Sequence, residues 1–484
     1  MSSNYLDLDI KTIHGMLVSK KITPKDLVLD AFSRVEANKE LNCFITLNKE
    51  EALKEADTLE VDKDNLLSGI PIAIKDNIVT KGLRTTCASH ILDNFIPVYD
   101  AFVVELLKKN GMIIIGKLNM DEFAFGSSSG TSYFGPVLNP WDKTLVPGGS
   151  SGGSAACVAS SITPFTLGSD TGGSIRQPSA FCGTVGLKPT YGRVSRFGLV
   201  AFASSLDQIG PITRNVYENA LLLNAICVKD DKDLTSVETK EDFTALIGKD
   251  ISNLKIAIPK FYVSSLIDKQ ILDKFNEVKS LLEKKGITLD LIDIPFIDYA
   301  VPLYQIIALG EASSNLARFD GIKYGYKAKD AKNTYEVYAK TRAEGFGDEA
   351  KRRIMIGSYM LSGPNAKEYF DKALKIRNSM SLELDKVFSK YDLLIGPTTT
   401  TLPYKVGSSL NDAVKAFLDD ILTIPVNMAG LPGMSLPIGF SKEHLPIGMQ
   451  IIAKRFDEKT IYQLASFLEK ELNLDLGGVK HEWL

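Results

Sequence analysis

Two segments rich in glycine and serine carry hydroxyl groups that could act as nucleophiles. They cover residues 147–154 and 168–176, and the small residues between them predict a compact helix. Consecutive small residues let several backbone N–H groups converge on one anion. Ser174 ends the second segment, so we expect a nucleophilic hydroxyl beside an oxyanion hole. The N–H groups of this oxyanion hole would come from Thr171, Gly172 and Gly173.

The same two segments could instead be linkers, turns or phosphate-binding loops. One glycine–serine segment alone is most often a linker or a turn. A phosphate-binding loop is disfavoured, because the chain has no GxxxxGK followed by Ser or Thr and no GxGxxG after an apolar strand. Two segments around a compact helix, with Asp170 and Arg176 close to the second, predict a functional site.

A lysine at the end of an apolar run is a candidate base. Residues 69–78 read Gly-Ile-Pro-Ile-Ala-Ile-Lys-Asp-Asn-Ile, which predicts a buried strand that ends at Lys75 and Asp76. Most lysines are solvated surface groups, and the pattern alone leaves that interpretation open for Lys75. In a buried position, loss of hydration would disfavour the charged amine and make it a base near neutral pH.

A serine nucleophile needs such a base, and histidine is the usual one. None of the four histidines lies in a glycine–serine segment or beside an apolar strand end with a carboxylate. The GxSxG pattern of a nucleophile elbow is also absent around Ser174. We therefore hypothesise a proton relay from Ser174 through the hydroxyl of Ser150 to Lys75, a variant of the serine–lysine arrangement.

The composition is that of an ordinary soluble protein. The 484 residues include 56 Lys and Arg and 59 Asp and Glu, which gives a formal net charge of −3. A protein that binds nucleic acid unaided usually carries a basic surface, which this composition does not indicate. The uncharged stretches 144–169 and 421–441 contain too much Gly, Ser or Pro for a membrane helix. Five scattered cysteines without a CxxC motif predict neither a disulfide framework nor a structural metal site. The start has no signal-peptide pattern, so we expect a cytoplasmic protein, bacterial rather than organellar, without membrane contact.

Alternating helical and apolar segments predict an α/β fold with helices on both faces of a sheet. The predicted helices are 24–37, 49–57, 100–110 and 268–285, and the predicted strands are 69–78, 112–116, 254–258, 287–294, 392–396 and 446–452. No composition break divides residues 1–484, so we expect one domain. Within it, residues 1–60 would form N-terminal helices and residues 228–370 a more helical elaboration.

These residues resemble the amidase signature family. The similarity is carried by Gly-Ile-Pro-Ile-Ala-Ile-Lys-Asp-Asn around Lys75 and by both glycine–serine segments. The resemblance implies a single domain with a mixed, twisted sheet and a Ser-cisSer-Lys triad. Ser174 would be the nucleophile, Ser150 the bridging serine after a cis peptide bond from Gly149, and Lys75 the base.

Further segments are similar to one branch of this family, the subunits that release ammonia from glutamine for a tRNA-dependent amidation. These segments are Met120–Gly126, Lys188–Leu199, Ser204–Pro211, Arg318–Gly321, Glu344–Gly347 and Pro425–Pro432. The branch implies a heterotrimer with a B-type and a C-type subunit. The B-type subunit would use ATP and Mg²⁺ and contact most of the tRNA, while this chain would bind no cofactor and no metal.

By the same resemblance, Tyr304, Arg353 and Asp420 would recognise glutamine. A guanidinium fork at Arg353 suits the α-carboxylate, and the carboxylate of Asp420 suits the α-ammonium. Without the resemblance, residues 351–353 and 419–420 would be interpreted as solvated charged faces.

Two other functions stay open on the sequence. A stand-alone amidase for another small amide would need neither partner subunits nor these recognition residues. A non-catalytic phosphate- or protein-binding module would use the glycine–serine segments without the chemistry of Lys75. Residues 130–136 and 362–370 depart from the pattern of the glutamine-hydrolysing branch and could shape the site entrance or a partner contact.

Overall fold

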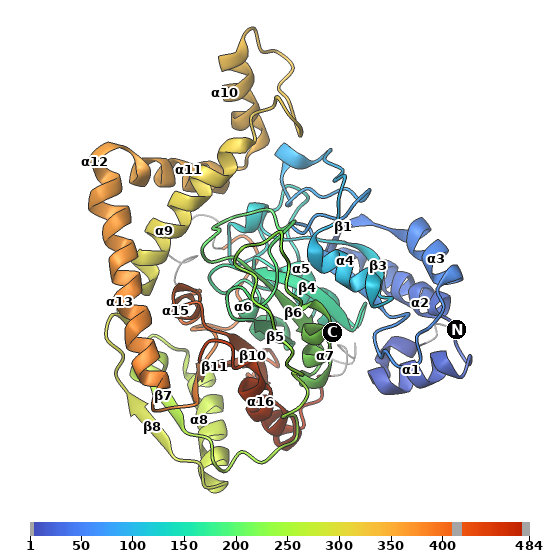
Figure 1. Ribbon diagram of the computed structural model, residues 1–484, viewed down its shortest axis with the longest axis vertical. Helices are drawn as coiled ribbons and strands as arrows, with labels where there is room; N and C mark the ends of the chain where they lie inside the picture. The colour runs from blue at the N-terminus through green and yellow to red at the C-terminus, as the bar shows by residue number, and fades with distance from the viewer. Residues whose placement is uncertain (1–3, 409–418, 477–484) are drawn as a thin grey trace.

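One eleven-stranded sheet organises the computed structural model, which describes residues 4–408 and 419–476 (Figure 1). Its strands are β1 (Phe44–Leu47), β2 (Pro71–Lys75), β3 (Ile113–Leu118), β4 (Phe165–Asp170), β5 (Val185–Lys188), β6 (Gln208–Thr213), β7 (Ile256–Pro259), β8 (Leu289–Ile292), β9 (Leu393–Pro397), β10 (Gly433–Phe440) and β11 (Pro446–Ala453). They follow the order β1-β3-β2-β4-β6-β5-β10-β11-β9-β7-β8. Strand β2 runs parallel to β3 and β4, whereas β4 is antiparallel to β6 and β10 to β11. The predicted α/β class with a mixed sheet is confirmed.

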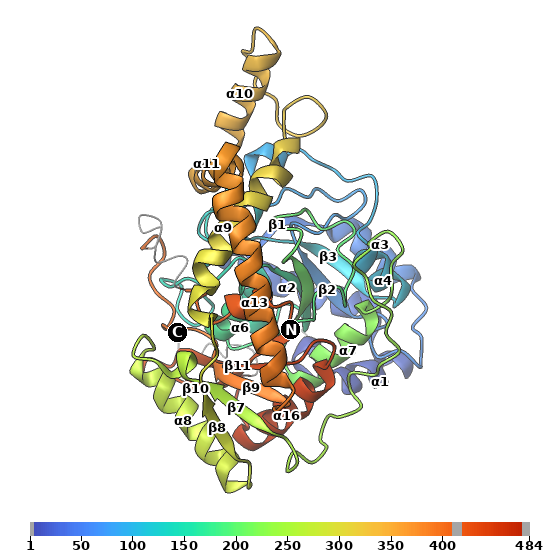
Figure 2. The same cartoon turned by 60° about the vertical axis from the view of Figure 1, so that its left-hand side comes forward.

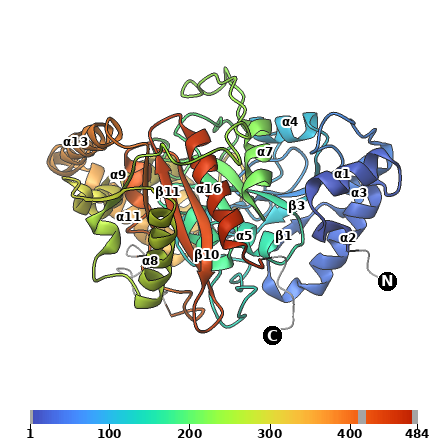
Figure 3. The same cartoon turned by 90° about the horizontal axis from the view of Figure 1, so that it is seen from below.

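Helices pack on both faces of this sheet. The α-helices are α1 (Ile10–Val18), α2 (Pro24–Ala37), α3 (Lys49–Thr58), α4 (Phe102–Lys109), α5 (Gly152–Ala159), α6 (Arg176–Cys182), α7 (Val216–Ile226), α8 (Lys269–Lys284), α9 (Ala300–Asn315), α10 (Thr334–Gly345), α11 (Asp348–Leu361), α12 (Gly363–Asn365), α13 (Asp371–Phe388), α15 (Ile424–Met428) and α16 (Glu458–Leu472). Helices α5 and α6 lie against one face of the central strands, and α7 and α16 against the other. Figure 3 shows α7 and α16 side by side.

The centre of the sheet brings the candidate base to the second glycine–serine segment. Strands β2 and β4 are parallel neighbours with Ile74 opposite Leu167, so their carboxyl ends meet at one edge. At that edge β2 ends at Lys75 and β4 ends at Asp170. Every residue of β2 is buried, as its apolar run predicted.

Several predicted elements agree with the structure and several strands were missed. The helix predicted at 24–37 is α2, and Thr23 forms a capping box with Asp26 at its start. Strands β1, β4, β5, β6 and β10 were not predicted. Strand β1 has only four residues, and glycine, proline and polar residues interrupt the apolar patterns of the other four. Glycine at position 186 of β5 allows α6 to approach closely, because a Cβ there would lie 2.1 Å from the Ser179 hydroxyl of α6.

A helical layer stands beside the sheet. Figure 2 shows α9 and α13 in front of the strands and α10 projecting beyond the body, and both α11 and α13 pack against α9. The interval 228–370 also supplies β7 and β8 to the sheet, and the helical layer continues through α13 to Phe388. Within the described ranges, no helix combines the length and apolar character needed to cross a membrane.

Candidate active site

The amine of Lys75 is buried among serine oxygens. Its Nζ lies 2.7 Å from Ser150 Oγ, 2.8 Å from Ser151 Oγ and 3.2 Å from the carbonyl oxygen of Ser169. Burial lowers the pKa of Lys75 to about 7, although nearby carboxylates, Asp121 foremost, act in the opposite direction. The amine is therefore uncharged in a large fraction of molecules at neutral pH.

These hydrogen bonds determine where the lone pair of the neutral amine points. The Ser169 carbonyl can only accept, and Ser151 Oγ donates its own proton to that carbonyl at 3.1 Å. The two N–H groups of a neutral Lys75 therefore donate to Ser151 Oγ and to the carbonyl oxygen of Ser169. Its lone pair is left for Ser150, whose hydroxyl proton it can accept.

Ser150 follows a cis peptide bond from Gly149, as the family resemblance led us to expect. Gly149 N donates to Gln177 Oε1 at 2.8 Å, and the carbonyl of Ser150 accepts from Asp121 N at 3.3 Å. The backbone on both sides of Ser150 is thus held by hydrogen bonds from other segments.

Ser174 lies against the first glycine–serine segment through its backbone. Ser151 N donates to the carbonyl of Ser174 at 3.1 Å, and Ser174 as a whole residue is buried but still 5% exposed. No hydrogen bond between the hydroxyls of Ser174 and Ser150 occurs among the residues the structure describes. Catalytic hydrogen bonds are often unformed without substrate.

The loop before Ser174 offers backbone N–H groups that can bind an anion. Within the described part of the chain, the N–H groups of Thr171, Gly172 and Gly173 donate to no acceptor. A buried ion pair stabilises the base of the loop, because Arg176 contacts both carboxylate oxygens of Asp170 at 3.1 Å. Burial alone would raise the pKa of Asp170, but Arg176 holds it below its usual value.

Tyr304 and Asp420 approach this loop from two other elements. Tyr304 belongs to α9, and a Cβ at Gly172 would lie 3.0 Å from its ring. Asp420 lies just before α15, and a Cβ at Gly173 would come within 2.6 Å of its Oδ1 atom. That oxygen is buried without a hydrogen-bond partner among the described residues. Burial and neighbouring Asp419 raise the pKa of Asp420 well above its usual value.

Arg353 reaches the same region from α11. Its side chain is buried, its Nε donates to Glu349 Oε1 at 2.6 Å, and its guanidinium lies 5.5 Å from the centre of the Phe125 ring. Arg353 also lowers the pKa of Asp420 against the effect of burial, as a nearby cation must. An oxygen acceptor suited to an ammonium thus stands beside the Ser174 loop, and a cation suited to a carboxylate lies within electrostatic range of that acceptor.

Two contributors to this site were not predicted. Ser151 orients the Lys75 amine, and Asp207 accepts a hydrogen bond from Thr171 Oγ1 at 2.7 Å and so holds the loop. Ser151 could have been noticed, because it lies in the first glycine–serine segment. Nothing in the sequence around Asp207 indicates that its carboxylate folds back onto Thr171.

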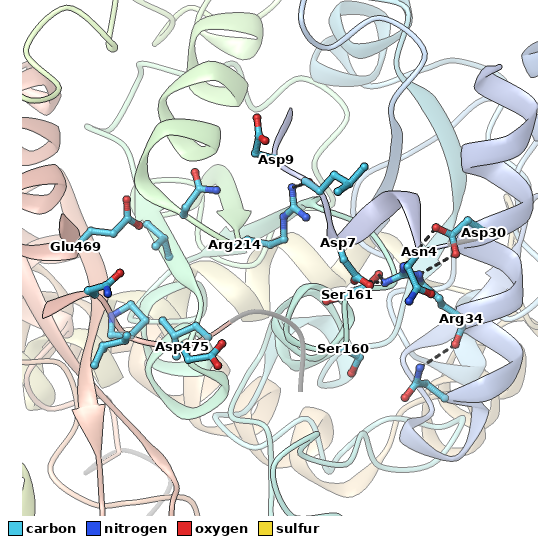
Figure 4. A pocket seen from close by; sticks show the side chains of 18 of the residues that line it. Asn4, Asp7, Asp9, Asp30, Arg34, Ser160, Ser161, Arg214, Glu469 and Asp475 are labelled. Carbon is cyan, nitrogen blue, oxygen red and sulfur yellow. Dashed lines mark hydrogen bonds and ion pairs between the residues drawn. The ribbon is translucent and has the colours of Figure 1, made fainter. Parts of the chain in front are cut away.

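A separate cavity of about 900 Å³ lies between the N-terminal helices and the end of α16 (Figure 4). None of the predicted site residues lines it. Its arginines are engaged in local pairs, Arg34 with Asp30 at 2.9 Å and Arg214 with Glu218. The candidate active site is therefore the Lys75–Ser174 region.

Comparisons with known proteins agree with this geometry. The model of the Amidase family matches residues 26–462. The chain is 52% identical to the A subunit of glutamyl-tRNA(Gln) amidotransferase from Pediococcus pentosaceus, over 96% of each chain. The A subunit from Oceanobacillus iheyensis is 50% identical, over 98% of this chain and 99% of that protein. The crystal structure of the A subunit from Thermotoga maritima is 42% identical and superposes with a TM-score of 0.82, covering 96% of this chain and 95% of that chain. The chain therefore belongs to the amidase family.

Proposed function

We propose that this chain is the glutamine-hydrolysing subunit of a glutamyl-tRNA(Gln) amidotransferase. The observation that carries the proposal is the buried amine of Lys75, whose lone pair faces Ser150 beside the loop of Ser174. Relatives at about half identity over nearly the whole chain are named as the A subunit of that enzyme.

The proposed reaction is acyl transfer through Ser174. The Ser174 hydroxyl gives its proton to Ser150 while Ser150 gives its own to Lys75, and Ser174 Oγ bonds to the carboxamide carbon of glutamine. The N–H groups of residues 171–173 stabilise the negative oxygen of the tetrahedral intermediate. The C–N bond then breaks, ammonia leaves with the proton returned from Lys75, and water hydrolyses the glutamyl ester.

Glutamine recognition is assigned to Tyr304, Arg353 and Asp420. Arg353 binds the α-carboxylate, Asp420 accepts from the α-ammonium, and Tyr304 packs over the loop that holds the reacting amide. Binding of the ammonium supplies the counter-charge that keeps the buried Asp420 carboxylate ionised.

The fate of the ammonia is inferred from these relatives. In this proposal a B-type subunit uses ATP and Mg²⁺ to activate tRNA-bound glutamate and converts it to the amide, and a C-type subunit completes a heterotrimer. This chain binds no cofactor itself. It contributes ammonia and contacts tRNA mainly through its partner.

The test measures ammonia release from glutamine by the co-expressed complex, with Ser174→Ala as the variant. We expect Ser174→Ala to lose glutamine hydrolysis and to retain amidation of glutamyl-tRNA(Gln) when ammonium is supplied. Joint loss of both activities would contradict the division of labour. Ser174-dependent hydrolysis of other small amides, but not of glutamine, would identify a stand-alone amidase instead.

A further inference from the structure

One short segment, residues 121–129, contacts both Ser150 and the elements that carry the recognition residues. We call it the bridge segment. At its start Asp121 N donates to the carbonyl of Ser150 at 3.3 Å. Towards its end Ser127 Oγ donates to Asp419 Oδ2 at 3.1 Å, next to Asp420. The bridge segment therefore joins parts of the site that lie far apart in the sequence.

Glu122 connects this segment to the start of α11. Both carboxylate oxygens accept from the N–H of Gly347, at 3.1 and 3.0 Å, and Gly347 is the residue that precedes α11. The single hydroxyl proton of Ser89 has two acceptors within reach, Glu122 Oε1 and, at 3.3 Å, the carbonyl of Gly345. A carboxylate at this place also interacts favourably with the positive end of the helix dipole.

The close approach of Glu122 requires a glycine at position 347. A Cβ at Gly347 would lie 2.5 Å from Glu122 Oε2, although the φ of −68° at this residue suits any amino acid. The contact is reinforced by apolar packing, since the rings of Phe123 and Phe346 have centroids 5.6 Å apart. The start of α11 thus contacts two consecutive residues of the bridge segment, Glu122 and Phe123.

Arg353 is carried by the same helix and rests on the same segment. It lies six residues after Gly347, which corresponds to about 9 Å along an α-helix. Its guanidinium lies over Phe125 of the bridge segment. A small tilt at the start of α11 would therefore move the guanidinium relative to Ser150 and Ser174.

We propose that Glu122 is a positioning residue for glutamine recognition. It holds the start of α11 and so keeps the guanidinium of Arg353 at a fixed position relative to Ser150 and Ser174. The inference rests on the proposed function and extends it. Glu122 does not touch the reacting atoms and acts through Arg353, so its loss weakens glutamine binding more than it slows the chemical step.

The experiment measures kcat and KM for glutamine in the co-expressed complex with Glu122→Ala. Because a displacement of about 1 Å can strongly reduce productive binding, we expect KM to rise on the order of tenfold while kcat changes less. Glu122→Gln should restore most of the affinity, since its carbonyl oxygen can accept from Gly347 N and its amide can donate to Ser89 Oγ. Gly347→Ala, which displaces Glu122 from the opposite side, should raise KM as Glu122→Ala does.

Glu469→Ala is the matched control. Glu469 is also a largely buried carboxylate, and its Oε1 accepts from Val216 N at 2.8 Å at the start of α7. Burial raises the pKa of both Glu122 and Glu469 to about 7. Glu469 lines the cavity of Figure 4, outside the active site, so its removal should leave the KM for glutamine unchanged.

The outcomes separate the positioning role from the function on which it rests. Ammonium-dependent amidation of glutamyl-tRNA(Gln) reports that each variant complex is folded and assembled. An active wild type with equal KM values for Glu122→Ala and Glu469→Ala overturns the positioning role alone. A Glu122→Gln variant as impaired as Glu122→Ala also overturns it, because the effect would then belong to the charge. A wild-type complex that releases no ammonia from glutamine overturns the proposed function itself.

Discussion

The proposed catalytic half and the proposed recognition half of the site are built in different ways. Lys75 ends β2, Ser150 lies in the loop before α5 and Ser174 lies in the loop between β4 and α6, all within 100 residues of one another. Tyr304, Arg353 and Asp420 come from α9, α11 and the turn before α15, all in the helical layer or next to it. The first half is fixed by the sheet, whereas the second depends on how helices are seated beside it. Substitutions in the first half should therefore change kcat, and those in the second should change KM.

The largest expected effect is the loss of the base. Lys75→Met keeps much of the side-chain volume but removes the proton acceptor, so kcat for glutamine hydrolysis should fall by about 10³-fold. The measurement is steady-state ammonia release by the complex.

Lys188→Met is the matched control for this substitution. Burial lowers the pKa of Lys188 to about 7, as it does for Lys75, but the Lys188 amine donates to the carbonyl of Pro189 at 2.8 Å and to none of the catalytic serines. Its replacement should leave kcat near the wild-type value. Equal losses in the two variants would mean that buried amines support the fold and not the chemistry.

A smaller effect is expected in the recognition half. Arg353→Lys keeps the charge but loses the planar fork that matches a carboxylate, so KM for glutamine should rise by roughly tenfold or more with a smaller change in kcat. Arg352→Lys is the natural comparison, because Arg352 is the neighbouring residue and also pairs with Glu349, at 2.7 Å. If Arg353→Lys lowered kcat and left KM unchanged, the proposed division between a half that controls kcat and a half that controls KM would be wrong.

The same contrast accounts for what could be predicted from the sequence. Lys75 was found because a lysine that ends an apolar run is a better candidate for a buried amine than a lysine in a polar stretch, and Ser174 because its glycine-rich loop is local in the sequence. Arg353 and Asp420 stand in charged stretches that look solvated, and only the family resemblance singled them out. Glu122 could not be recognised, because its acceptor role depends on Gly347, 225 residues away.

The pH dependence of kcat is the smallest expected effect. It distinguishes the two halves of the site, because titration of Lys75 changes kcat whereas titration of Asp420 changes KM. In the proposed mechanism the base is neutral Lys75, whose pKa burial lowers to about 7, so kcat should rise with pH through that value and fall about fivefold from pH 7 to pH 6. Burial raises the pKa of Asp207 to about 6, so protonation of that carboxylate would contribute only at the lower end of this range. Protonation of Asp420 weakens binding of the ammonium and therefore appears in KM, which is why kcat must be measured at saturating glutamine. Ammonium-dependent amidation, measured at the same pH values, corrects for changes in the rest of the complex. A kcat that stays flat between pH 6 and pH 8 would show that Lys75 does not titrate in the rate-limiting step.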